Sequence, residues 1–351
     1  IPALLRFQMI ILEARARGVE PTTPDIDFFS WFGNAWTLFP VVLCALTTWA
    51  VIAVGARFGV AWAFAVSLVV SLLLLLASAF AIQIVRHWDI GSGSERQLVL
   101  ERRTYLISTL VSWAFAAELV SLLLFIYNAE AMSGQFVGAM CATGVLNVNQ
   151  WGWPTMLVKI AIFFSGAVWL ILNAIDNKGY DYPLVRLKYL LLLLIVPMVL
   201  AELVLQLLHF LDLDPEIITS CCGSLFSADA QGVAAEMSAI EPGTAARALY
   251  GSGALVMASG VWYSITRRGG ALLAVAGMLA FVVALAAIIS FVSLYVYEHP
   301  HHHCPFCILK SGHNYIGYLL YLPLFAATAL AMGVGAVAPW RAVPSLAQVV
   351  P

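Results

Sequence analysis

Long apolar runs are the feature that most constrains what this chain can fold into. A helix that crosses a bilayer needs roughly 20 apolar residues, and about eight segments reach that length. Because backbone polar groups in lipid must be satisfied within the segment, the runs predict an all-α, polytopic bundle of transmembrane helices. A charged content of 10% and a mean hydropathy of +0.93 agree with this class. The predicted spans are 38–56, 60–85, 104–127, 153–175, 189–211, 246–266, 271–297 and 315–338.

The basic residues predict which ends of the helices face the cytoplasm. One set of connections is rich in Lys and Arg, whereas the other set holds only Arg57, Arg247 and Lys310. By the positive-inside rule the first set is cytoplasmic, together with both termini. We therefore expect a multi-pass protein of the bacterial inner membrane, with the lipid bilayer and other membrane or periplasmic subunits as partners. No basic stretch indicates nucleic acid. The first set comprises Arg6, Arg15, Arg17, Arg86, Arg96, Arg102, Arg103, Lys178, Arg186, Lys188, Arg267, Arg268 and Arg341.

This topology divides the chain into five predicted parts. An N-terminal segment starts at Ile1 rather than Met, so we expect the natural start to lie upstream. It lacks a small-residue cleavage site and does not look like a signal peptide. It ends in the stretch FFSWFGNAW, which is typical of an interfacial aromatic belt. The parts are 1–36, the first hairpin 37–103, a hairpin 104–188, a hairpin 189–270 and a last hairpin 271–351.

The cysteines gather on one side of the predicted membrane. Cys141, the pair Cys221 and Cys222, and the pair Cys304 and Cys307 fall in three different outer loops. Cys44 lies inside a predicted span and is interpreted as a small core residue. The outer face of a bacterial inner membrane permits disulfides, so five of six cysteines share the side where thiol redox chemistry occurs.

Two predicted hairpins resemble each other and suggest an internal repeat. The spans RTYLISTLVSWAFAAELVSLLLF and KYLLLLLIVPMVLAELVLQLLHF share a tyrosine and a glutamate at one offset. Tyr105 and Glu118 correspond to Tyr189 and Glu202. Each span precedes a loop with cysteine near glycine. Chance similarity between leucine-rich helices is the alternative explanation.

Several predicted spans carry polar residues at membrane depth. Charges there cost about 2.5–3.5 kcal/mol each on insertion scales, so they are candidates for function. We expect Lys159 to pair with Glu118 on a neighbouring helix. Separately, Glu202, Gln206, His209 and Asp212 repeat at helical spacing along one span. They are interpreted either as a proton path or quinone-pocket wall, or as hydrogen bonds that hold the bundle together.

The stretch EHPHHHCPFCILK, which starts at Glu298, combines a dithiol with histidines. Pro305 suits the first turn of a helix, so we expect Cys304 at a helix N-terminus, where the helix dipole and a nearby imidazolium favour its thiolate. Cys307 would then close an exchangeable disulfide with it. The same spacing is also half of a zinc site. Ile308 after Cys307 argues against attachment of a c-type haem.

The motif CPFCILK resembles the dithiol stretch of DsbB-like, quinone-linked, disulfide-forming membrane proteins. That resemblance implies that Cys304 and Cys307 form the dithiol beside a bound quinone, that Lys310 lies near the family's basic residue, and that a second cysteine pair exchanges with the dithiol. The match covers seven residues. The chain departs from the family in its number of spans and in carrying the dithiol in its last outer loop.

The remaining cysteines and the histidines leave the chemistry of the site open. We expect Cys141 to bridge to Cys221 or Cys222, because a disulfide between adjacent residues is strained. Five outer cysteines cannot all pair, so one sulfur is left for exchange, a metal or a partner. Imidazoles beside thiolates suit Zn or Cu, and His209 with one loop histidine would suit a b-type haem. The loop histidines are His299, His301, His302 and His303.

Three functions are compatible with the sequence. The first is a membrane thiol–disulfide oxidoreductase coupled to a quinone or a partner protein. In it Cys304 is the reactive thiolate, Cys307 resolves it, and Cys141 with Cys221 or Cys222 relays electrons. The second is a metal- or haem-binding transporter or electron-transfer subunit. The third is a non-catalytic subunit whose outer loops are held by disulfides.

Overall fold

The computed structural model describes residues 64, 66–89, 91–92, 94–214, 216–219, 240–298 and 304–346. The chain divides into two compact units, Ile1–Arg57 and Phe58–Pro351, and every described residue belongs to the second. The predicted span 38–56, Cys44 and the aromatic belt lie outside the described residues. The same is true of Cys221, Cys222 and the four loop histidines.

Helices form the described part of the chain, which contains no strand. Within it, six helical segments are long and apolar enough to cross a membrane. The predicted span 246–266 corresponds to α9, which is helical but is not among those six. The helices are Val66–His87, α3 (Glu95–Met132), α4 (Ala142–Leu146), α5 (Gly152–Asp176), α6 (Val185–Leu211), α9 (Pro242–Thr266), α10 (Gly270–Ala287), α11 (Ser293–Tyr297) and α12 (Ile316–Val337), with a π-helical turn Ile288–Val292 between α10 and α11.

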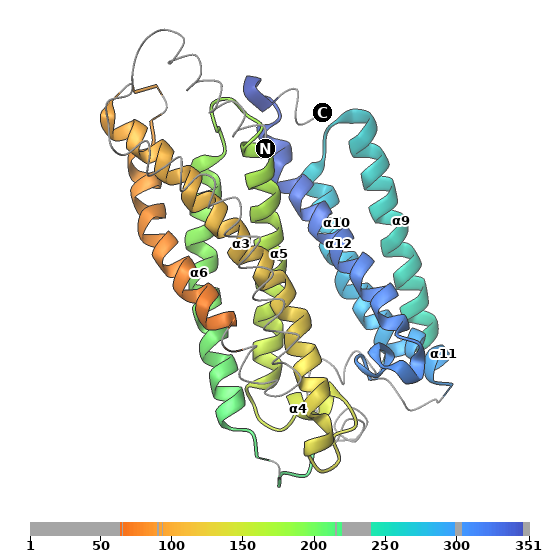
Figure 1. Ribbon diagram of the computed structural model, residues 1–351. Coiled ribbons are helices and arrows are strands. Elements are labelled where there is room, and N and C mark those ends of the chain that lie inside the picture. Colours follow the sequence, from red (N-terminus) through yellow and green to blue (C-terminus); the bar gives the residue numbers. More distant parts are fainter. Residues whose placement is uncertain are drawn as a thin grey trace. The chain divides into compact units, whose positions relative to one another are not determined.

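The helix Val66–His87 packs with α3, α5 and α6 around one hydrophobic core (Figure 1). Phe115 of α3 contacts Trp169 of α5 with ring centroids 5.2 Å apart, and both side chains are fully buried. The indole of Trp169 donates to the carbonyl oxygen of Lys188 at 2.8 Å. These contacts join α3, α5 and the first turn of α6.

Lys188 corrects one part of the topology prediction. The sequence placed it in a cytoplasmic connection, but α6 already begins at Val185 and buries the Lys188 side chain. Its ammonium group lies 2.7 Å from Asp176, and Asn173 accepts a hydrogen bond from it at 2.9 Å. A buried lysine is tolerated here because its charge is paired and hydrogen-bonded.

Small residues bring α10 and α12 close together. A Cβ atom added to Gly277 would lie 2.8 Å from Cβ of Ala331, and one added to Gly335 would lie 2.5 Å from Cβ of Ala274. Such contacts are typical of membrane helices, whose backbones approach closely where side chains are small. Gly333, on another side of α12, meets Ile171 of α5 and so connects this pair to the first group of helices.

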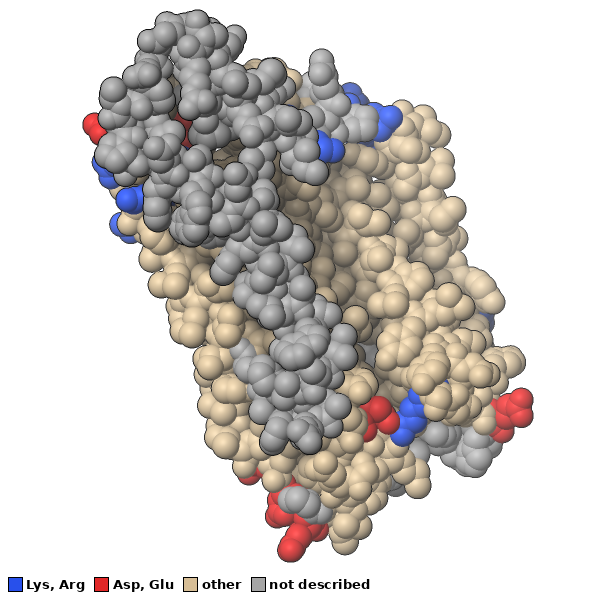
Figure 2. Space-filling model, in the orientation of Figure 1, with Lys and Arg blue, Asp and Glu red and all other residues tan. Residues whose placement is uncertain are grey.

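Three connections lie together at one end of the described bundle. Asn149, which precedes α5, donates to the carbonyl oxygen of His209 at the end of α6. Lys310, which precedes α12, pairs with Glu130 near the end of α3 at 2.7 Å. The helices α3 and α6 therefore run in parallel toward this end. On the face shown in Figure 2, most Lys and Arg atoms gather at the opposite end.

The proposed internal repeat remains a prediction. The parallel course of α3 and α6 is compatible with it, and Glu118 and Glu202 are both buried. The aligned tyrosines differ, since Tyr105 is 51% exposed whereas Tyr189 is fully buried and donates to the carbonyl oxygen of Thr104.

Candidate cysteine site

Cys141 lies at the start of the short helix α4, all of whose residues are buried. The preceding α3 ends at Met132 and is followed by a 3-10 turn, Ser133–Gln135. Glu130 then accepts a hydrogen bond from the backbone N–H of Ala142 at 2.9 Å. This bond satisfies one of the orphan N–H groups of α4 and holds Cys141 against the end of α3.

The CPFC motif forms a turn rather than the start of a long helix. The sequence predicted Cys304 at a helix N-terminus, but two short 3-10 helices, Cys307–Leu309 and Ser311–His313, follow it, and α12 begins only at Ile316. The helix α12 does not extend back to the CPFC motif, because Lys310 is extended and Asn314 and Tyr315 have positive φ angles. These conformations end a helix.

The structure brings three cysteines together from two distant loops. The sulfurs of Cys141 and Cys304 are 3.1 Å apart, and the hydroxyl oxygen of Thr143 is also 3.1 Å from the Cys304 sulfur. The sulfurs of Cys141, Cys304 and Cys307 all lie within 4.8 Å of one another. All three side chains are buried in a hydrophobic cluster that includes Phe125. The cluster can hold a thiophilic metal ion or exchange a disulfide.

The surroundings of Cys304 and Cys307 shift the pKa values of the two thiols in opposite directions. Hydrogen bonds from Cys141 and then Cys307 hold the pKa of the Cys304 thiol well below its usual value, against the opposing effect of burial. Cys307 is affected in the opposite direction, since its interactions with Cys141 and Cys304 and its burial raise its pKa. Cys304 is therefore the natural thiolate, and Cys307 the natural thiol.

A charged pair borders the cluster on one side. The Lys310 ammonium lies 2.7 Å from Glu130 and also donates to the carbonyl oxygen of Met140, the residue before Cys141. Partial burial lowers the pKa of Lys310, but its hydrogen bond and ion pair with Glu130 outweigh this, so the pKa is raised. Lys310 therefore keeps a positive charge beside the cysteines.

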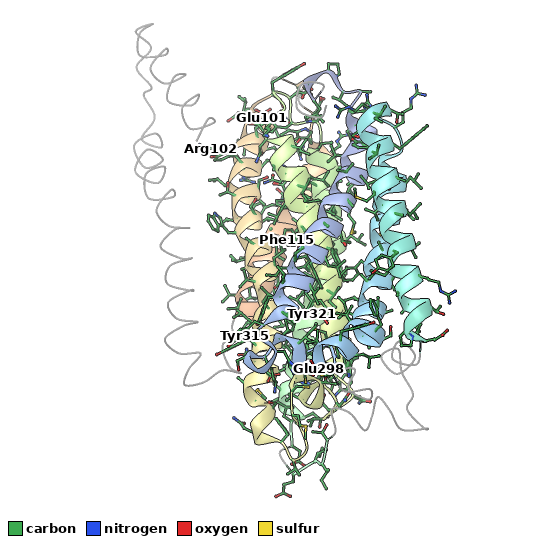
Figure 3. All side chains as sticks on the ribbon, turned by 90° about the vertical axis from the view of Figure 1, so that its right-hand side faces the viewer. Glu101, Arg102, Phe115, Glu298, Tyr315 and Tyr321 are labelled. Carbon is green, nitrogen blue, oxygen red and sulfur yellow. The ribbon has the colours of Figure 1, made fainter. Side chains whose placement is uncertain are left out.

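Two tyrosines fix the backbone of the CPFC turn. Tyr297, at the end of α11, donates to the carbonyl oxygen of Cys304, and Tyr321 of α12 donates to that of Pro305 at 2.9 Å. Both tyrosines come from the helices on either side of the loop. Figure 3 labels Tyr321 near this end of the bundle, together with Glu298 and Tyr315.

The segment after α6 docks onto the Cys141 loop. Thr219 donates from its backbone N–H to Val137 at 2.9 Å and from its hydroxyl group to the carbonyl oxygen of Gly144 at 2.8 Å. Gly138 makes this contact possible, because a Cβ atom there would lie 2.1 Å from the carbonyl oxygen of Thr219. Cys221 and Cys222, which follow Thr219, lie outside the described residues, as do His299 and His301 to His303.

The polar residues of α6 do not form one buried surface that extends to the cysteines. Glu202, Gln206 and His209 are buried, whereas Asp212 is exposed and caps the helix. The imidazole Nδ1 of His209 lies 2.8 Å from the side-chain oxygen of Asn149. His209 thus ties α6 to the loop before α5, which fits the structural interpretation of this residue.

Lys159 has a different partner from the one predicted. The sequence favoured Glu118, but the ammonium group of Lys159 lies 2.6 Å from Glu202 and donates to Ser121 at 2.7 Å. Which glutamate Lys159 reaches depends on how each helix is rotated about its axis. The spacing of residues along one helix does not determine that rotation. Glu118 lies within electrostatic range of both Lys159 and Glu202.

Sequence reasoning missed Glu130, Thr143 and the two tyrosines. Glu130 carried a usable signal, since it is the acidic residue next to the loop that faces Lys310. Thr143 lies in the CATG stretch, of which only the cysteine and the glycine entered the predicted repeat. Tyr297 and Tyr321 gave no signal, because aromatic residues are common near the ends of membrane helices.

No known protein family, curated protein or solved structure matches this chain. What the structure defines is a class: a helical, membrane-spanning protein with a buried cluster of three cysteines that has the geometry to hold a metal.

Proposed function

We propose that the protein is a membrane thiol–disulfide oxidoreductase that moves electrons between thiols at the outer face and a two-electron acceptor of the quinone class. The observation that carries this proposal is the position of Cys304. Its sulfur is 3.1 Å from that of Cys141 and also reaches Cys307 within the same cluster. A thiolate with two partner sulfurs can pass a disulfide from one to the other.

The proposed cycle begins at the dithiol. Cys304 and Cys307 give two electrons to the quinone, which takes up the proton of Cys307 and one proton from water and leaves as quinol, and a disulfide forms between the two cysteines. The deprotonated sulfur of Cys141 then attacks Cys304, and Cys307 leaves as a thiolate that takes up a proton. Cys221 or Cys222 exchanges with the new Cys141–Cys304 disulfide, and an external dithiol reduces the resulting disulfide and is itself oxidised. The sum is one dithiol and one quinone converted to one disulfide and one quinol.

Cys221 or Cys222 is the proposed link to external thiols. Cys141 is fully buried, so a large substrate has no direct contact with its sulfur. Thr219 is anchored beside Cys141, and Cys221 follows it by two residues. Two residues span at most about 7 Å of chain. This tether supports the proposed exchange of Cys141 with one of the adjacent cysteines.

Lys310 is the residue that we propose to serve the quinone side. Its raised pKa keeps it cationic, and it faces the sulfurs of Cys307 and Cys141. A fixed positive charge there stabilises both a leaving thiolate and the anionic oxygen of a quinone that is being reduced. By sequence Glu202, Gln206 and His209 were the other candidates for quinone contact, and they remain proposals for this role.

A bound thiophilic metal is the second candidate function. Three sulfurs within 4.8 Å suit Zn or Cu(I), since zinc–sulfur bonds of about 2.3 Å place tetrahedral ligands about 3.8 Å apart. The loop histidines from His299 to His303 are the proposed further ligands. A b-type haem on His209 is the third proposal: Asn149 holds Nδ1 of this imidazole and leaves Nε2 to bind the iron.

Trapping of mixed disulfides in lipid nanodiscs tests the proposal. With Cys307→Ser, we expect Cys304 to accumulate a stable disulfide with Cys141. The matched control Cys44→Ser should cycle like the natural protein and reduce ubiquinone when a dithiol peptide is supplied. Cysteines that stay oxidised and never exchange would contradict the proposal and support loops held by static disulfides. Stoichiometric metal that is lost in Cys304→Ser would support the second candidate.

A further inference from the structure

A second polar cluster lies inside the membrane-spanning part of the bundle, away from the cysteines. Lys159 of α5 pairs with Glu202 of α6, Ser121 of α3 accepts from Lys159, and Glu118 lies one turn before Ser121. Glu118 follows Phe115, which is labelled midway along the helices in Figure 3. The side chains of Lys159, Glu118 and Glu202 are each 3% exposed or less.

The charges in this cluster do not balance if both carboxyl groups are ionised. Lys159 is the cation that faces Glu118, and Glu202 is the competing anion. The helix Val66–His87 contributes the neutral Ser67, whose hydroxyl lies 3.5 Å from both Lys159 and Glu202. A net negative charge in hydrocarbon is costly. One proton shared with the two carboxyl groups makes the cluster neutral.

The hydrogen bonds indicate where that proton resides. Lys159 already binds Glu202 at 2.6 Å, whereas Oε1 of Glu118 has no hydrogen-bond partner among the described residues. The same holds for Oε2 of Glu202, for both side-chain polar atoms of Gln206 and for the hydroxyl of Ser71. Buried polar atoms are normally satisfied. Water molecules inside a protein bind such atoms and can carry protons between them.

We propose that Glu118, Lys159 and Glu202 form a proton-binding site inside the membrane, in which Glu118 carries the exchangeable proton. Gln206 follows Glu202 by one turn of α6 toward the cysteine end, is fully buried, and offers both a donor and an acceptor for proton transfer. The inference is independent of the thiol chemistry, since it uses no cysteine.

Labelling with dicyclohexylcarbodiimide, an apolar reagent that adds to protonated carboxyl groups, tests the proposal in nanodiscs. We expect Glu118 to be modified, as located by peptide mass spectrometry, and Glu202 to be spared. Above the pKa of a single titrating carboxyl group, labelling should fall about tenfold per pH unit. Glu118→Gln should abolish the modification. The matched control Glu95→Gln, at the exposed start of α3, should retain it.

A second variant separates proton binding from a merely structural role. In Glu202→Gln the ammonium of Lys159 is released to pair with Glu118, so Glu118 should ionise and its labelling should be lost while the protein stays monodisperse. The infrared carbonyl band of a protonated carboxyl group should disappear in the same variant. Labelling of Glu118 that persists in Glu202→Gln, or an absent infrared band in the natural protein, would overturn the proposal. Protection by sodium at constant pH would assign the site to a metal cation instead.

Discussion

At the scale of single residues, Gly138 shows how one position holds two loops together. Its φ angle of +84° lies in the left-handed region, and Thr219 occupies the space that a side chain would need. Both features favour glycine. The adjoining Cys141 loop and the segment leading to Cys221 therefore depend on the absence of a Cβ atom.

Gly138→Ala should loosen the docking of Thr219 and destabilise the protein by about 1–3 kcal/mol, since strain and a backbone contact act together. Gly134→Ala is the matched control, because nothing lies within 4 Å of its added Cβ atom. Thermal unfolding in detergent, with limited proteolysis between α6 and α9, measures both effects. Equal stability and equal cleavage in the two variants would show that Thr219 does not depend on Gly138.

The dithiol makes a prediction about pH. Cys304 has a lowered pKa, so its thiolate persists as the pH falls below the range of ordinary thiols, whereas the raised pKa of Cys307 keeps that residue protonated. In the reduced protein, iodoacetamide should therefore modify Cys304 before Cys307 near pH 7. The ratio of Cys304 modification to Cys307 modification should decrease only as the pH rises. Mass spectrometry of the CPFC peptide measures it, and preferential modification of Cys307 would reverse the assigned roles.

Residue patterns predicted that the cysteines lie close together, but they did not predict which glutamate pairs with Lys159. The loops of Cys141 and Cys304 were expected on one face, and the two sulfurs are in contact. The choice of Glu202 rather than Glu118 by Lys159 was not predictable. Both glutamates lie on helices beside α5, and only the rotation of each helix decides which one the ammonium reaches.

At the scale of elements, the sequence predicted helices more accurately than the turn that carries the dithiol. Apolar length located α5, α6 and α12 to within a few residues, because the bilayer sets the length of a span. The helix expected at Cys304 was wrong. Pro305 is compatible with a helix start, but the positive φ angles at Asn314 and Tyr315 delay α12. Neither residue is a glycine, so a positive φ angle was not expected at either position.

The α10–α12 contact makes a prediction about packing. Gly335→Leu should separate the two helices, because the first added carbon would already lie 2.5 Å from Ala274. We expect a loss of about 1–3 kcal/mol, as is usual when a well-packed interface receives extra carbons. Gly251→Leu on α9 is the matched control, since its added Cβ atom meets nothing within 4 Å. Thermal stability in detergent compares them, and an equal loss would contradict the close contact.

At the scale of the whole molecule, the cysteine end of the bundle is predicted to be the end that a reagent outside the cell can reach. In a cysteine-free background, Gly134→Cys and Gly312→Cys introduce thiols at the cysteine end, where both positions have open space. An impermeant maleimide added to intact cells should label both. Gly91→Cys, before α3 and at the other end, should react only after the cells are broken. Labelling of Gly91→Cys in intact cells would reverse the predicted sidedness.

The topology prediction succeeded where charge and length determine the outcome. Alternation of basic and acidic connections placed the loops of Cys141 and Cys304 at one end, where the structure has both, and six of the predicted spans correspond to apolar helices. The assignment of the outer face to the periplasm remains a prediction. Contacts between loops could not be predicted, because they depend on turn conformations such as that of Gly138.

The Lys159–Glu202 pair also has a consequence for biogenesis. Each charge alone would raise the cost of placing its helix in the bilayer by about 2.5–3.5 kcal/mol. Yet α5 and α6 are antiparallel neighbours in the chain, separated only by residues 177–184, and their charges meet at 2.6 Å. The two helices can therefore neutralise each other as soon as both have been synthesised. We expect α5 and α6 to leave the insertion machinery as one hairpin rather than one helix at a time.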